Sequence, residues 1–263
     1  IFDEAHRTIG RKDDSSNFTK LLFDKNILID KRIFFTATPK VYIGSSDKFF
    51  GMEDSNIFGT TIDEVSFAEA LKFKRPDGSN VLTDYQIITL NCNSESVISL
   101  IGKNKYLELI SDKKNETIES HVLASSVGLR KAKYKYKIKK TISFHSRIKR
   151  AKLFAEHQKY MNNYFSSSEP LHIDGKFKAN KRNEIINKFA QSKDAIIANA
   201  RCLTEGVDIE SVDSILFVDP RNSLVDIVQA CGRALRPYKG KKYGYIFIPV
   251  ISNTLDDDAL KLK

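Results

Sequence analysis

From residue 141 to residue 250, short apolar runs alternate with stretches of helical periodicity. The apolar runs, rich in Ile, Phe and Val, are residues 141–144, 171–173, 195–198, 215–218 and 245–248. Helical patterns fall at residues 151–160, 181–189 and 224–235. Strands that alternate with helices of this length predict a parallel sheet that helices cover on both faces. The fold class predicted for this part of the chain is therefore α/β.

The first 90 residues carry a weaker version of the same pattern. Ile1-Phe2 resembles the end of a strand, and residues 33–36 form a second apolar run. Residues 65–73 fit a short helix, and residues 85–90 fit a strand that leads out of this part. We therefore expect residues 1–90 to be the end of one α/β domain and residues 141–250 to be a second, complete one.

Residues 91–140 separate these two parts and are mostly helical by pattern, and residues 251–263 form a polar tail. The run 130–140 carries seven basic residues, and Tyr134 and Tyr136 within it can stack on nucleic-acid bases. A solvated helix end or linker whose lysines point outward is the alternative.

Charge and cysteine usage limit the class of protein. The chain has 43 Lys and Arg against 33 Asp and Glu, a net charge of +10 that favours polyanionic partners through counterion release. Charge of this size also occurs in proteins from lysine-rich proteomes. The three cysteines and five histidines show no metal-ligand spacing, so we expect reduced thiols, a cytoplasmic protein and no structural metal.

The ends of the chain and its hydropathy bear on targeting. No run approaches the roughly 18 apolar residues that a membrane span requires, so we expect no membrane association. The chain opens with Ile-Phe-Asp-Glu, without an initiator Met or the basic and apolar regions of a signal peptide. We expect it to be a fragment of a longer protein.

Asp3-Glu4-Ala5-His6 directly follows an apolar strand end. Ligands of an open parallel sheet bind outside the carboxyl ends of its strands. There Asp3 can hold Mg²⁺, and Glu4 can orient and deprotonate a water molecule that attacks a nucleotide. Taken alone, the same four residues also suit an exposed acidic loop.

Two further signatures follow predicted strands. Thr36-Ala37-Thr38 places small hydroxyl residues where backbone and side chains can couple two sites, although an ordinary strand end has the same composition. The segment 199–208 contains Gly206, which permits backbone conformations that other residues avoid. Asp208 in the same segment can accept hydrogen bonds from a ribose hydroxyl or an arginine. A simple turn is the alternative for this segment.

Residues 229–236 carry the strongest signature. The spacing predicts that Arg233 and Arg236 lie on one helical face, where paired guanidinium groups suit a phosphoryl group that gains charge in its transition state. Gly232 costs a helix roughly 1 kcal/mol relative to alanine, which favours a structural reason for it. An exposed basic helix end before Pro237 is the alternative for either arginine.

In this order, the four signatures resemble motifs II, III, V and VI of the superfamily 2 helicases. The segment 144–147 resembles motif IV, and residues 172–175 resemble the segment that follows it. Residues 4–10, 82–85 and 199–202 look most like helicases of bacteria and viruses that are related to type I and type III restriction-enzyme motor subunits. The resemblance covers nearly the whole chain apart from roughly residues 91–140.

The resemblance implies two RecA-like domains, the first partial and the second complete, with ATP and Mg²⁺ in the cleft between them. The catalytic residues would be Glu4, Gln229, Arg233 and Arg236. Nucleotide binding would use Asp3, Glu4, His6, Gly206, Asp208, Arg233 and Arg236, with Asp3 holding Mg²⁺ through water. Thr36, Ala37 and Thr38 would couple the sites, and nucleic acid would contact Phe144, His145, Ser146, Arg147, Leu203 and Thr204.

The sequence departs from the family at two points. None of its 12 glycines begins the Gly-x-x-x-x-Gly-Lys-[Ser/Thr] phosphate-binding loop, so we expect this chain alone to be inactive. Ala200 stands where many relatives carry a threonine that touches nucleic acid.

Three functions remain open. The first is an ATP-dependent helicase or translocase that acts on DNA rather than RNA. The second is the motor of a restriction-modification system that translocates duplex DNA without unwinding it, with restriction or modification subunits as partners. The third is a non-catalytic nucleic-acid-binding remnant.

Overall fold

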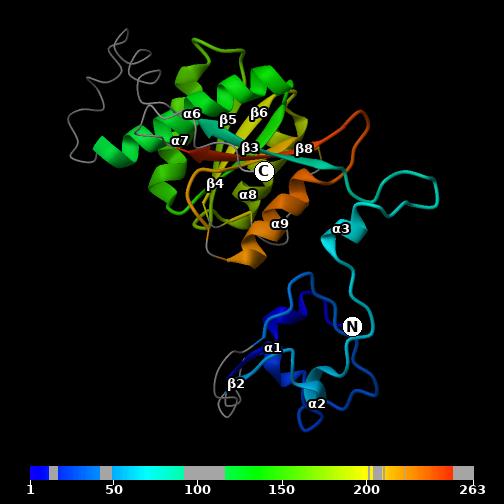
Figure 1. Cartoon of the computed structure of the whole chain (residues 1–263). Helices are drawn as coiled ribbons and strands as arrows, with labels where there is room; N and C mark the ends of the chain where they lie inside the picture. Colours follow the sequence, from blue (N-terminus) through cyan, green and yellow to red (C-terminus); the bar gives the residue numbers. More distant parts are fainter. Residues whose placement is uncertain are drawn as a thin grey trace. The chain divides into compact units, whose positions relative to one another are not determined.

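The protein is described here by a computed structural model, which divides into two compact units, Ile1–Ser66 and Phe67–Lys263 (Figure 1). We refer to them as unit 1 and unit 2. The structure describes residues 1–11, 17–41, 49–91, 116–200, 202–203, 209, 211–221 and 223–250. Among these residues, none of the helices has the length and apolar character needed to cross a bilayer.

Unit 2 is built on a six-stranded sheet in which every described pair of neighbours is parallel. The order of the strands across the sheet is β3-β8-β7-β4-β6-β5. Their bounds are β3 Tyr85–Asn91, β4 Lys140–His145, β5 Glu169–Asp174, β6 Ala195–Ala200, β7 Ser214–Phe217 and β8 Gly244–Val250. The predicted α/β class with a parallel sheet is confirmed.

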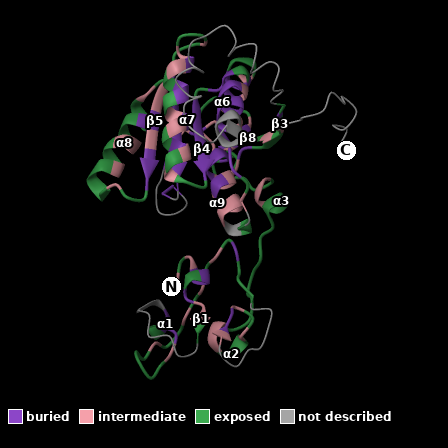
Figure 2. Ribbon diagram, turned by 90° about the vertical axis from the view of Figure 1, so that its left-hand side faces the viewer, coloured by how far each residue is buried: buried purple, intermediate pink, exposed green. Residues whose placement is uncertain are grey.

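Helices cover both faces of this sheet (Figure 2). They are α6 Glu116–Tyr136, α7 Ile148–Met161, α8 Ala179–Gln191 and α9 Leu224–Ala234. Alternate residues of the central strands point to opposite faces, as on β6, where Ile196 packs with α6 and α7 while Ile197 packs with α8 and α9. Burial on both faces explains why the strands are nearly continuous apolar runs.

The division of the chain differs from the one predicted from the sequence. The units separate between Ser66 and Phe67, not near residue 90. Strand β3 belongs to unit 2 because it pairs with β8 over its whole length, from Tyr85 beside Gly244 to Asn91 beside Val250. Helix α6 packs against α7 and the sheet, so residues 116–136 are part of this unit rather than a linker.

The basic run 130–140 is only partly a solvated helix end, since Lys131, Lys135, Lys137 and Lys139 are exposed. Arg130, Lys133 and Lys140 are buried. Tyr136 packs against Tyr245 at a ring-centroid distance of 5.3 Å, so it is not free to stack on a base. Tyr134, in contrast, is 82% exposed.

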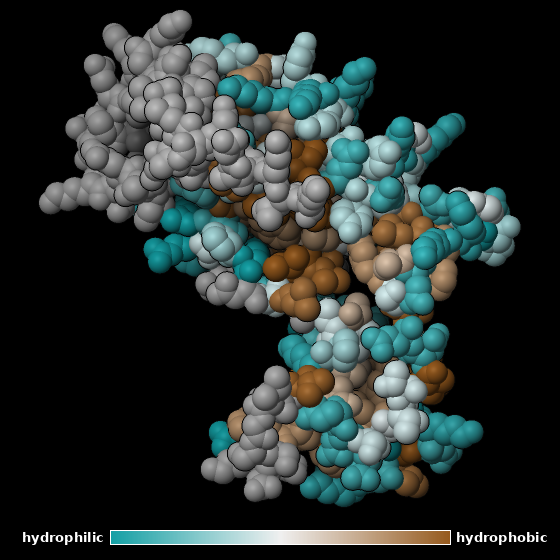
Figure 3. All heavy atoms as spheres, in the orientation of Figure 1, coloured by the Kyte–Doolittle hydropathy of each residue, from teal (hydrophilic) through white to brown (hydrophobic). Residues whose placement is uncertain are grey.

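Unit 1 contains short elements around a small core. They are η1 Ala5–Arg7, β1 Gly10–Arg11, α1 Asn17–Lys20, β2 Phe49–Phe50 and α2 Ser55–Phe58. The expected strands at Ile1-Phe2 and 33–36 meet in a single parallel bridge between Phe2 and Phe34. Apolar atoms reach the surface of unit 1 at several places (Figure 3), and Leu28 and Phe35 are among the exposed side chains. The helix expected at 65–73 is the shorter α3 Phe67–Ala70, which lies in unit 2.

Candidate functional site

Three polar segments of unit 2 follow the carboxyl ends of neighbouring strands. Ser146 follows β4, Cys202 follows β6 and Asp219 follows β7, and both β6 and β7 pair with β4. The helices after β4 and β7 lie on opposite faces of the sheet. Open α/β sheets bind ligands at such a switch point, outside the carboxyl ends of the strands.

Asp219 organises the carboxyl ends of β4 and β7, and sequence reasoning missed it. Its carboxylate accepts hydrogen bonds from the backbone amide of Ser146 at 2.7 Å and from its hydroxyl at 2.8 Å, and Arg150 pairs with it. Burial by itself raises the pKa of Asp219, but these hydrogen bonds and the Arg150 charge outweigh it and hold the pKa below its ordinary value. The signal in the sequence was an acidic residue directly after the apolar run 215–218.

Two of the expected nucleic-acid contacts in segment 144–147 are buried. Phe144 stacks on Phe217 in one core, and His145 packs beside Phe154 in the other. Burial lowers the pKa of His145 to about 3, so the ring is neutral at physiological pH. Both side chains are buried because successive residues of a buried strand point into opposite cores, and their contact with nucleic acid stays a prediction. Ser146 and Arg147 are exposed.

The segment after β6 begins with a buried side-chain hydrogen-bond acceptor. Asn199 Oδ1 accepts hydrogen bonds from the backbone amides of Cys202 at 3.1 Å and Leu203 at 2.9 Å, which fixes the turn after the strand. Leu203 is completely buried, so its side chain belongs to the core rather than to a binding surface. Thr204, Gly206 and Asp208 lie outside the described residues.

The arginines of segment 229–236 do not share one helical face. Helix α9 ends at Ala234 with Leu235 as its C-cap, so Arg236 lies beyond the helix. Arg233 is 6% exposed, whereas Arg236 is exposed. Gln229 on the same helix has a buried Oε1 without a hydrogen-bond partner among the described residues.

The carboxyl end of α9 is held by hydrogen bonds from Lys241, which follows it, and from Thr83, which is distant in the sequence. Lys241 Nζ donates hydrogen bonds to the carbonyls of Ala234, Arg236 at 3.0 Å and Val212 at 2.6 Å. The amide of Thr83 donates to the Leu235 carbonyl at 2.8 Å. Burial lowers the pKa of Lys241 to about 8. These bonds fix the backbone on both sides of the exposed Arg236.

Gly232, in contrast, has open space around it. A Cβ at this position would meet no atom of the described structure within 4 Å. Nothing in the described part of unit 2 therefore explains why glycine occupies a position in this helix.

Unit 1 brings the two signatures at residues 3–6 and 36–38 into contact. His6 Nδ1 lies 2.9 Å from Thr36 Oγ1 and 3.3 Å from Glu4 Oε2. Thr36 Oγ1 also accepts a hydrogen bond from the Thr38 amide at 3.2 Å. The backbone of Glu4 is left-handed, with φ 50° and ψ 44°, a strained conformation that is frequent at functional sites.

Asp3 fits the role of a weak Mg²⁺ ligand. Its exposed carboxylate accepts the Glu4 amide at 2.9 Å through Oδ1. Mg²⁺ is usually held by one or two carboxylates together with waters and phosphate oxygens. Within the described ranges no group of three His, Cys, Asp or Glu forms a protein cage for a metal.

Comparison with known proteins shows what the chain is similar to. Residues 113–238 match the family described as helicase conserved C-terminal domain. The chain is 28% identical to the solved structure of the ATP-dependent Type ISP restriction-modification enzyme LlaBIII bound to DNA, with a TM-score of 0.71 over 97% of this chain and 18% of that one.

Two curated helicases are similar over most of this chain. The "Probable helicase A859L" of African swine fever virus, isolate Tick/South Africa/Pretoriuskop Pr4/1996, is 26% identical over 97% of it and 26% of the viral protein. A protein of Saccharomyces cerevisiae strain ATCC 204508 / S288c, designated ATP-dependent helicase IRC3, is 20% identical over 94% of it and 33% of the yeast protein. The chain thus spans about a quarter to a third of the length of these relatives. Residues 113–238 thus match the helicase conserved C-terminal domain, and over nearly its whole length the chain is similar to helicases and to a restriction-modification enzyme.

Proposed function

We propose that the complete protein containing this chain is an ATP-driven motor on DNA. In this proposal Asp3, Glu4, Arg233 and Arg236 all serve the hydrolysis of Mg²⁺-bound ATP by the complete protein. The observation that carries it is the contact of His6 with Thr36, which joins two signatures 30 residues apart. Through this contact, a change at the catalytic carboxylate of Glu4 can be transmitted to the strand end at Thr36 when nucleotide binds.

Each group has one task in this mechanism. Glu4 orients the attacking water and accepts its proton, a role that contributes typically ~10²–10⁴ in rate. The Mg²⁺ ion, held by Asp3 through water, would neutralise charge on the phosphates. Arg236 is exposed on a fixed backbone and stabilises the charge that develops on the transferred phosphoryl group. Gln229 has a buried oxygen available to a ligand.

The experiment that tests the proposal is ATP hydrolysis by the complete protein without DNA, with single-stranded DNA and with duplex DNA. Glu4→Gln and Arg236→Ala are each expected to lower the DNA-stimulated rate at least ~100-fold. Lys239→Ala removes a neighbouring exposed positive charge and should leave the rate unchanged. DNA binding without hydrolysis under any condition would instead indicate a binding remnant.

The form of DNA that stimulates hydrolysis separates unwinding from translocation. The likeness to a Type ISP restriction-modification enzyme bound to DNA, at 28% identity over 97% of this chain, favours DNA as the nucleic acid on which the protein acts. Two results together would support a restriction-type motor. Duplex DNA would stimulate ATP hydrolysis, and the protein would displace the third strand of a triplex without separating the strands of a duplex. Stimulation by single strands with duplex separation would support a helicase.

A further inference from the structure

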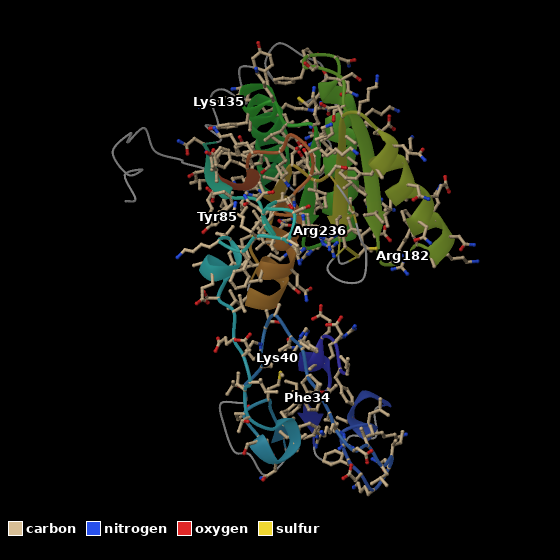
Figure 4. All side chains as sticks on the ribbon, turned by 90° about the vertical axis from the view of Figure 1, so that its right-hand side faces the viewer. Phe34, Lys40, Tyr85, Lys135, Arg182 and Arg236 are labelled. Atoms are coloured by element: carbon tan, nitrogen blue, oxygen red, sulfur yellow. The ribbon has the colours of Figure 1, made fainter. Side chains whose placement is uncertain are left out.

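A basic pocket of about 950 Å³ lies on unit 2 where helix α6 meets the sheet. Its lining includes Lys139, Ser166 and Asp194, which stand directly or shortly before the first residues of β4, β5 and β6. The pocket therefore lies at the amino-terminal edge of the parallel sheet. Ser146 and Asp219 follow the carboxyl ends of the strands, about 20 Å from the start of β4 at 3.3 Å per residue. Lys135 is also well separated from Arg236 (Figure 4).

The pocket has a rigid frame. Arg130 is 2% exposed and donates hydrogen bonds to Gln158 Oε1 at 2.6 Å, Asn162 Oδ1 at 2.7 Å and the Ser166 carbonyl at 3.0 Å. These contacts join the end of α6 to the end of α7 and the following turn. Lys133 pairs with Asp194 at 3.0 Å and thereby neutralises an acidic group of the lining.

The remaining charge is positive and accessible. In the described part of the lining, six residues are basic and one is acidic. Lys131 and Lys135 lie one helical turn apart at the end of α6, and Lys137 and Lys139 continue into the loop before β4. All four of these lysines are exposed. This spacing presents several positive charges to an anionic chain rather than to a single ion.

Exposed aromatic rings accompany these lysines. Tyr134 stands between Lys131 and Lys135 in the sequence and is 82% exposed, and Tyr164, which also lines the pocket, is exposed. An acidic peptide would use only the positive charges of such a surface. Single-stranded nucleic acid uses both features, since its phosphates pair with lysines and its bases stack on aromatic faces.

We propose that this pocket is a second binding site for single-stranded nucleic acid, separate from the site at the carboxyl ends of the strands. Lys131 and Lys135 contact phosphates, and Tyr134 stacks on a base. The inference rests on the proposed function only in assuming that the protein handles nucleic acid, because binding at this pocket needs no ATP.

The test is binding of a fluorescently labelled oligothymidylate of about 16 nucleotides to the 263-residue chain without nucleotide, over a range of salt concentrations. The double variant Lys131→Glu and Lys135→Glu is expected to weaken binding at least ~10-fold and to reduce the slope of log affinity against log salt by about 1.4. Tyr134→Ala should weaken binding about 5-fold or more. Ultraviolet crosslinking to a bromouracil-substituted strand should label the peptide that contains Tyr134.

The matched control is the double variant Lys181→Glu and Lys188→Glu, which reverses two exposed charges on α8. Equal affinities for this control and the pocket variants would overturn the inference, as would the absence of any binding to the chain. If polyglutamate competes as well as unlabelled oligonucleotide, the pocket binds an acidic protein segment, and the inference is also overturned. None of these outcomes affects the ATPase test, so the two proposals fail independently.

Discussion

At the scale of single residues, a substitution at Gly232 can distinguish an effect on stability from an effect on function. A methyl group there meets no atom within 4 Å, and alanine favours a helix by roughly 1 kcal/mol over glycine. Gly232→Ala is therefore expected to raise the free energy of unfolding of the chain by about 1 kcal/mol in urea titration. If the open space accommodates a ligand or a moving part, the same change lowers the DNA-stimulated ATPase rate of the complete protein.

The control for this prediction is Ala230→Gly, two residues earlier on α9 at a buried position. It should destabilise the chain, because glycine adds conformational entropy to the unfolded state and removes a packed methyl group. A Gly232→Ala protein that is more stable and fully active would show that the glycine has no functional role.

At the scale of elements, the position of Arg236 depends on the capping of α9 by Lys241. Lys241→Met removes three hydrogen bonds to carbonyls that then lack this donor. We expect the free energy of unfolding to fall by about 1–3 kcal/mol, the cost of unpaired buried polar groups. Lys242→Met, at an exposed neighbour, should change it by less than about 0.5 kcal/mol. Equal effects of the two substitutions in urea unfolding would refute the capping role.

Elements with local signals were predictable, and elements defined by distant partners were not. The strands and helices after residue 140 appear close to their expected bounds, because each has an apolar period of its own. The carboxyl end of α9 is set by Lys241 and Thr83, which no periodicity connects to it. The burial of Arg130 similarly depends on Gln158, 28 residues away.

The candidate site was predicted in the same uneven way. The contact of His6 with Thr36 fits the motif order in the sequence. The hydrogen bonds between Ser146 and Asp219 join residues that are 73 positions apart in the sequence. They depend on the pairing of β4 with β7, which no local pattern in the sequence predicts. The burial of Phe144 and His145 follows from the alternation of side chains along a buried strand, and the resemblance to motif IV did not predict it.

At the scale of the whole molecule, the division between Ser66 and Phe67 predicts which part of the chain folds by itself. Residues 59–69 are all exposed, so protease should cleave there first. A chain that begins at Phe67 retains β3 and the complete six-stranded sheet. It is expected to unfold in one cooperative transition.

A chain that begins at residue 92, close to the boundary predicted from the sequence, lacks β3. Seven residue pairs between β3 and β8 are then lost, and the long apolar strand β8 becomes an unprotected edge. We expect it to unfold at a lower urea concentration than the longer chain and to aggregate more readily. Urea unfolding of the two chains side by side checks this. Identical midpoints would mean that β3 adds nothing to unit 2 and that the sheet is complete with five strands.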